Sequence, residues 1–267
     1  MTLELRFSRQ SIYFRGIIQH SIPYDHEIVT QIELHDVEGI RRSFSQGLDP
    51  NSLLGGKPLI QELISEYTRG PRFKECVRVF GDFGLQFEDQ ALLAILMDDG
   101  DAIRKIIGRN SEIVKSRYTL RCAYTPLFEV TLLHVCAEFN HLSCAIELVA
   151  AGADVNAKAG LDTFGFGGHT PIFHTVNQNN NLSADMMDYL LSRDADLRTS
   201  VDGLIWGRGY DWETFIPAVN PISYAMMGSL PQMHRDERTI SRVVSTLMKH
   251  AYGIVYTAAN VPNKYLS

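Results

Sequence analysis

The stretch Thr131-Leu-Leu-His-Val-Cys-Ala-Glu-Phe-Asn-His-Leu-Ser-Cys-Ala-Ile-Glu-Leu-Val-Ala-Ala-Gly-Ala-Asp-Val-Asn156 is the most informative part of the chain. Its apolar residues recur at helical spacing, which predicts a short helix over 132–139, a break at Asn140-His141 and a second helix. Gly152 suits the left-handed end of that second helix, and the Asp and Asn that follow suit a turn. Because a lone pair of short helices cannot bury its apolar face, this stretch predicts stacking against similar pairs.

The same pattern occurs earlier in the chain. His35-Asp-Val-Glu-Gly-Ile-Arg-Arg-Ser-Phe-Ser-Gln-Gly-Leu-Asp-Pro-Asn51 reads as a helix that ends at Gly47 before an Asp-x-Asn turn. Both segments resemble ankyrin repeats, whose unit of about 33 residues has a Thr-Pro-Leu-His-like helix start, a Gly-His-like turn and a Gly-Ala-Asp-like exit. Aligned on the helix start, candidate units begin near His26, Lys57, Ala91, Thr131, Thr170 and Asn220. The positions expected to end their second helices are Gly47, Gly84, Asn110, Gly152, Asp194 and Ala251.

The resemblance implies an all-α fold. We expect an α-solenoid of about six ankyrin-like helix-turn-helix repeats, joined by β-hairpin-like fingers. Residues 1–25 are expected to form an N-terminal cap, residues 26–257 the repeat domain, and residues 258–267 a C-terminal tail. Apolar and polar residues alternate from Thr2 to Ser8, which predicts a strand in the cap.

Composition excludes several classes of protein. The 267 residues include 25 basic and 31 acidic side chains, a net charge of −6, which argues against nucleic acid as a partner. No window approaches 18 apolar residues, so we expect no association with a membrane. The N-terminus lacks the apolar stretch of a signal peptide, and the four cysteines stand among apolar neighbours, as buried thiols do. These features together predict a cytoplasmic protein.

The chain offers few candidates for chemistry. His134, Cys136, His141 and Cys144 are residue types that bind zinc, but the repeat gives each a structural place, with His134 bracing the helix start. We therefore predict no metal and no cofactor. The sequence also has no Gly-x-Ser-x-Gly elbow and no phosphate-binding Gly-Lys-Ser/Thr, so no catalytic residue is assigned and the protein is not expected to be an enzyme.

Two insertions depart from the repeat and lengthen successive fingers, which should lie side by side. The finger at 157–169 carries Phe164 and Phe166, and the insertion at 198–219 carries Trp206, Tyr210 and Trp212. Aromatic residues on loops are typical of protein interfaces, so these five are the candidate partner contacts. The alternative is that they pack on one another and on the adjoining helices, which would make the insertions compact loops.

The resemblance implies a non-catalytic protein–protein interaction module, either an adaptor or an inhibitor or immunity-type binder, that recognises a partner through its first helices and fingers. The negative charge favours a basic partner. The competing hypothesis is an enzyme or small-ligand-binding protein with a pocket beneath the loops at 157–169 and 198–219. A deep cleft with convergent polar groups would favour the pocket, and a shallow aromatic patch would favour protein binding.

Overall fold

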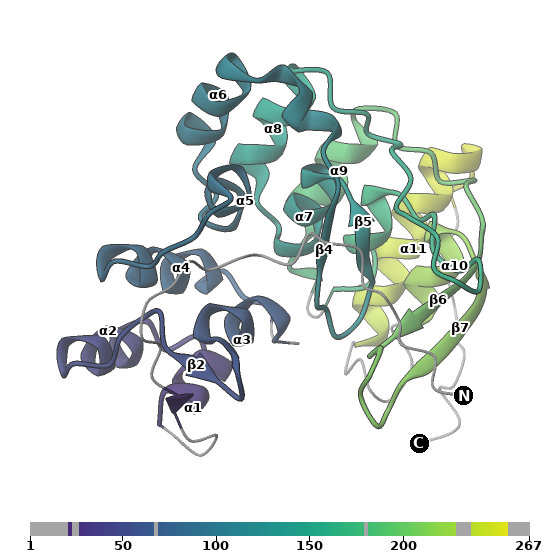
Figure 1. Ribbon diagram of the computed structural model, residues 1–267. Helices are drawn as coiled ribbons and strands as arrows, with labels where there is room; N and C mark the ends of the chain where they lie inside the picture. Colours follow the sequence, from purple (N-terminus) through teal and green to yellow (C-terminus); the bar gives the residue numbers. More distant parts are fainter. Residues whose placement is uncertain (1–20, 23–26, 67–68, 179–180, 228–235, 256–267) are drawn as a thin grey trace.

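Short helices follow one another in pairs along the chain (Figure 1). The computed structural model describes residues 21–22, 27–66, 69–178, 181–227 and 236–255. The predicted strand at Thr2–Ser8, the repeat start at His26 and the tail at 258–267 lie outside these residues. The helix pairs are α1 (Glu27–Glu33) with α2 (Val37–Ser45), α3 (Leu59–Ser65) with α4 (Phe73–Asp82), α5 (Gln90–Leu96) with α6 (Gly100–Arg109), α7 (Leu132–Phe139) with α8 (Leu142–Ala150), the 3-10 turn η2 (Pro171–His174) with α9 (Ala184–Leu191), and α10 (Pro221–Met226) with α11 (Glu237–Tyr252).

Side-chain caps fix where these helices begin. Thr131 and His134 form a reciprocal capping box at the start of α7, where Nδ1 of His134 accepts the Thr131 N–H at 3.2 Å. This confirms the bracing role predicted for His134. Asn140, between α7 and α8, has φ of 55°, a left-handed conformation that asparagine tolerates better than most residues. The predicted helix at 132–139 and the break after it are therefore confirmed.

Two of the predicted helix exits differ from expectation. α6 ends at Asn110 as predicted, but this residue has φ of −148° rather than a left-handed conformation, and its side chain caps a 3-10 turn, η1 (Ser111–Lys115), that continues the chain. Helix α11 does not end at Ala251, because it continues to Tyr252 and closes on Gly253 at φ of 68°. The helix therefore ends at the glycine two residues beyond the position that the repeat spacing predicts. Glycine adopts the left-handed conformation at a helix end without a steric penalty.

The fifth unit has no α-helix at its predicted start. After Thr170 the chain forms only the turn η2, and the Thr175 hydroxyl donates to the Ile172 carbonyl at 2.9 Å. Such a local side-chain bond competes with helix continuation. The turn nevertheless packs against α7, in the place of a first helix.

Hairpins form most of the links between helix pairs. β2 (Leu53–Leu54) pairs with β3 (Lys57–Pro58), and β1 (Ser21–Ile22), in the predicted cap, runs parallel to β2. β4 (Tyr118–Leu120) pairs with β5 (Leu127–Val130), and β6 (Val201–Trp206) pairs with β7 (Thr214–Val219). The insertion at 198–219 is thus a regular antiparallel hairpin rather than an irregular loop.

The helix pairs share one apolar core, but they do not follow a strict neighbour-to-neighbour stack. α5 and α6 lie against α7 and α8, as stacked repeats do. Earlier in the chain, Lys74 of α4 pairs with Asp98 in the turn between α5 and α6 at 2.8 Å. Phe73 of α4 also reaches past this neighbouring pair and stacks on Phe139 of α7 with ring centroids 4.3 Å apart. In Figure 1 the first two pairs accordingly form one end of the molecule, at the lower left. No described helix is both long and apolar enough to cross a bilayer.

Candidate functional site

Three consecutive fingers lie side by side on the structure, joined by backbone hydrogen bonds. Gly160 donates to the Phe128 carbonyl of β5 at 3.1 Å, and Gly167 donates to the Gly203 carbonyl of β6 at 3.0 Å. Gly207, just after β6, donates to the Ala123 carbonyl in the β4–β5 loop at 2.7 Å. The predicted neighbourhood of the two long fingers is therefore confirmed, and the β4–β5 hairpin joins them.

Trp206 is not a surface residue and cannot be a partner contact as predicted. Its side chain is 2% exposed, and its indole N–H donates to the Tyr224 hydroxyl of α10 at 2.6 Å. The Tyr224 hydroxyl also lies 2.8 Å from the hydroxyl of Thr125. Trp206 lies on the buried face of β6 with Leu204, because alternate strand residues point to opposite faces. Packing is the role that the structure gives to this tryptophan.

The other predicted aromatics reach the surface. Phe164 is 75% exposed and Trp212 is 42% exposed, while Phe166 and Tyr210 are half-buried. Phe166 contacts Phe215 with ring centroids 4.8 Å apart, and Phe215 is 48% exposed. A Cβ at Gly203 would lie 2.4 Å from the Phe215 ring, so this glycine allows the ring to lie flat on β6.

Sequence reasoning missed three exposed apolar side chains beside these aromatics: Phe128, Leu161 and Phe215. Phe128 lies on β5, next to Gly160 and Leu161 of the following finger. We call the exposed or half-buried apolar side chains of the three fingers the finger patch: Phe128, Leu161, Phe164, Phe166, Tyr210, Trp212 and Phe215. Successive residues of a strand point to opposite faces, so Phe215 is exposed where its neighbour Ile216 in β7 is buried. This exposure could be predicted only if the insertion were first recognised as a hairpin.

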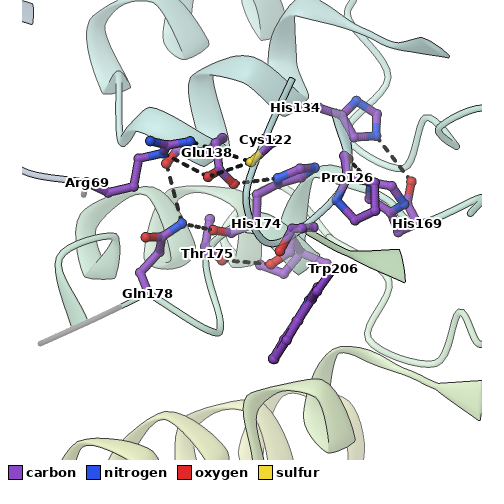
Figure 2. Close-up of polar contacts among 12 residues, drawn as sticks. Arg69, Cys122, Pro126, His134, Glu138, His169, His174, Thr175, Gln178 and Trp206 are labelled. Atoms are coloured by element: carbon purple, nitrogen blue, oxygen red, sulfur yellow. Dashed lines mark hydrogen bonds and ion pairs between the residues drawn. The ribbon is translucent and has the colours of Figure 1, made fainter. Parts of the chain in front are cut away.

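A second cluster, of buried polar groups, ties distant parts of the chain together (Figure 2). Nε of Arg69, in the α3–α4 loop, donates to Oε1 of Glu138 on α7 at 2.9 Å, and Nδ1 of His174 in η2 lies 2.8 Å from Oε2 of the same carboxylate. Arg69 also lies over the Phe139 ring at 4.6 Å. Burial tends to raise the pKa of Glu138, but the charge of Arg69 and the hydrogen bond from His174 outweigh it and hold this pKa below its ordinary value.

His134 and His169, beside this cluster, are buried and neutral. Nε2 of His169 lies 2.8 Å from the Pro126 carbonyl, and Nε2 of His134 lies 3.2 Å from the His169 carbonyl (Figure 2). Burial, with a further contribution from His174, lowers the pKa of His169 to about 3. The pKa of His134 is also lowered well below its ordinary value, first by burial. Both rings therefore act as fixed hydrogen-bond donors that hold the fingers on the first helices.

Neither the predicted zinc-type residues nor the cysteines are arranged for chemistry. His141 contacts the Ile95 carbonyl through Nδ1 at 2.6 Å, and Cys136 and Cys144 are fully buried. Within the described part of the chain, no group of three or more His, Cys, Asp or Glu side chains could hold a metal ion. Burial raises the pKa of Cys122 to about 12, so this thiol beside Glu138 is protonated and is a poor nucleophile.

A small pocket opens beside the buried ion pair. Its volume is about 100 Å³, and it lies where the α3–α4 loop meets the α7–α8 turn and the start of α9. The lining residues are Arg69, Gly70, Pro71, Lys74, Glu138, Phe139, Asn140, His141, Leu182 and Ser183. This is not the pocket hypothesised beneath the two long fingers, where the buried Trp206 and Tyr224 side chains occupy the space instead.

Comparison with known families agrees with the geometry of one helix pair. The family model described as ankyrin repeat matches residues 129–159, which span the end of β5, α7, α8 and the start of the following finger. No curated protein matches the chain.

Proposed function

We propose that all the helix pairs of this chain are ankyrin-like repeats, as residues 129–159 are, and that it is a non-catalytic protein-binding module. Ankyrin repeats are generally protein–protein interaction modules. The helix pairs before and after the matched one have the same helix–turn–helix order, and their irregularities fall at the first helix of the fifth pair and at the contact between α4 and α7.

The observation that carries the proposed function is the finger patch. Its most exposed members are Phe164 at 75%, Leu161 at 60%, Phe215 at 48%, Trp212 at 42% and Phe128 at 41%. Large apolar side chains gathered on neighbouring fingers are costly in water unless a partner covers them, and aromatic residues are enriched among interface hot spots. We propose that Phe164, Phe166, Tyr210 and Trp212, together with Phe215, contact a partner protein.

The pocket hypothesis receives less support than protein binding. Trp206 and Tyr224 close the space beneath the long fingers with a hydrogen bond and ring contacts. Adaptor and inhibitor roles both require the same exposed surface, and the net charge of −6 favours a basic partner for either role.

The test compares proteins captured by the wild-type chain and by the Phe164→Ala/Phe215→Ala variant, using quantitative mass spectrometry of an affinity purification from the native source. We expect at least one protein to be lost by roughly tenfold or more, because two exposed aromatic anchors are removed. Ile146→Ala/Leu34→Ala is the matched control, since both side chains are exposed and apolar but lie outside the fingers. Identical capture by all three chains would contradict the proposed function.

A further inference from the structure

Trp212 is held firmly by its neighbours and still presents a face to solvent. Its ring stacks on Tyr210 with centroids 5.1 Å apart and an interplanar angle of 26°, and it lies 5.8 Å from the ring of Tyr124. On another side it lies against Gly207, where a Cβ would come within 2.4 Å of the indole. The indole is nevertheless 42% exposed. The ring is thus fixed in position, and the part of it that is exposed is available for contact.

This ring cluster already binds one cationic group from within the chain. The guanidinium of Arg121, in the β4–β5 loop, lies 4.3 Å from the centroid of the Tyr210 ring. A guanidinium over an aromatic face is attracted by the negative charge density of the ring. The intramolecular contact therefore shows the kind of group that these rings accept, and it uses the Tyr210 ring rather than Trp212.

The charges around Trp212 are mainly negative. Asp211 and Glu213 flank it in the sequence and are exposed, and the Glu213 carboxylate accepts the Gly209 N–H at 2.9 Å. The neighbouring cation Arg208 is paired with Asp162. Burial raises the pKa of Tyr210. Arg121 opposes this change, whereas Glu62 of α3 and Glu66, just after α3, add to it, so two further carboxylates lie within electrostatic range of the cluster.

We propose that the exposed part of the Trp212 side chain, with its sequence neighbours Asp211 and Glu213, is the subsite that receives an arginine or lysine side chain of the partner protein. The inference rests on the proposed function and specifies the partner chemistry at one end of the finger patch. A cation there gains both ring and carboxylate contacts, whereas an acidic segment would be repelled. The remaining aromatics of the patch would cover apolar side chains of the same segment.

The test uses a display library of random dodecapeptides selected on the wild-type chain. Selected peptides are then measured by fluorescence titration against Asp211→Asn/Glu213→Gln, which removes both charges without changing side-chain shape. Glu75→Gln/Asp188→Asn is the matched control, because it changes the net charge equally at exposed positions on α4 and α9. The Phe164→Ala/Phe215→Ala variant reports whether binding uses the finger patch at all.

We expect the selected peptides to carry Arg or Lys beside apolar residues. Their affinity should fall by roughly tenfold on Asp211→Asn/Glu213→Gln and stay within about twofold on the control. Patch-dependent peptides that are neutral or acidic, or that bind Asp211→Asn/Glu213→Gln as well as wild type, would overturn the subsite while leaving the proposed function intact. Peptides that ignore Phe164→Ala/Phe215→Ala, or no selected peptide, would contradict both.

Discussion

Glu138 carries a charge in the interior because Arg69 and His174 both bind its carboxylate. Replacing it by Gln leaves the Arg69 guanidinium, whose side chain is 8% exposed, without its counter-charge. We expect Glu138→Gln to lower the free energy of unfolding by about 3–5 kcal/mol, measured by chemical denaturation. Glu112→Gln is the control: its ion pair with Lys115 is exposed, so its effect should stay within about 0.5 kcal/mol. An equal effect for both variants would contradict the structural role of the buried pair.

His169 predicts how stability depends on pH. Its pKa falls from 6.5 to about 3 on folding, so the unfolded chain binds a proton that the native chain excludes between these values. Above the pKa of His169 in the unfolded chain, this residue does not reduce the free energy of unfolding. As the pH falls below that value, the free energy of unfolding decreases by about 1.4 kcal/mol per pH unit. His169→Gln keeps an N–H donor for the Pro126 carbonyl and removes the titration. The slope of unfolding free energy between about pH 6 and pH 4 should therefore decrease by that amount; an unchanged slope would count against this account.

Single residues also show what the sequence could predict. The Thr-Leu-Leu-His pattern predicts the bracing role of His134, because the hydrogen bond that braces the helix start joins it to Thr131, three positions away. Arg69 and Glu138 are 69 positions apart, and their pairing depends on how helix pairs pack, which leaves no local signal. The conformations of the residues that end the helices were partly predictable. Gly47 and Gly152 have positive φ as predicted, whereas Asn110 does not.

The β6–β7 hairpin places its two tryptophans in opposite environments. Trp206→Ala should destabilise the protein by about 3–5 kcal/mol, because it empties a buried site and leaves the Tyr224 hydroxyl short of a partner. Trp212→Ala should cost less than half as much in a thermal or chemical melt, because its ring is 42% exposed, yet it should weaken partner binding. A Trp206→Ala variant as stable as Trp212→Ala would contradict the assignment of these two roles.

If the sequence of the insertion had been interpreted as two paired strands, it would have predicted that one tryptophan is buried and the other is exposed. Buried Leu204 and Trp206 alternate along β6, and Ile216 lies directly opposite Leu204 on β7. The sequence showed aromatic residues and glycines, which indicated an elaborated finger. The close approach of Phe215 to Gly203, and of Trp212 to Gly207, arises only after the strands pair, so the composition of the finger was predictable and its two faces were not.

For the molecule as a whole, the contact between α4 and α7 is one of the contacts that join the first two helix pairs to the rest. Phe73 is 1% exposed and stacks on Phe139. Phe73→Ala should therefore increase hydrogen exchange on both sides of this contact, in α4 and at the end of α7. Phe80→Ala is the matched control, because Phe80 packs on Phe44 within the first two pairs and should affect α4 without affecting α7. Indistinguishable exchange patterns for the two variants would show that the junction does not couple the two parts.

The helix pairs and their order were predictable across the chain because caps, glycines and apolar spacing act locally. How the second pair meets the fourth was not, because it depends on side-chain fit at Phe73 and Phe139 and on the Arg69–Glu138 ion pair. The expectation of a regular stack came from the family resemblance, and this chain departs from it at that junction.

Protein recognition by the finger patch is the central claim, and site-specific photocrosslinking in cells tests it most directly. A photoreactive benzoylphenylalanine is introduced in place of Phe164, or in place of Ile146 on α8, which is also exposed but lies away from the fingers. The account predicts a discrete crosslinked protein adduct from position 164 that is absent from position 146. No adduct at position 164, or the same adducts from both positions, would contradict it.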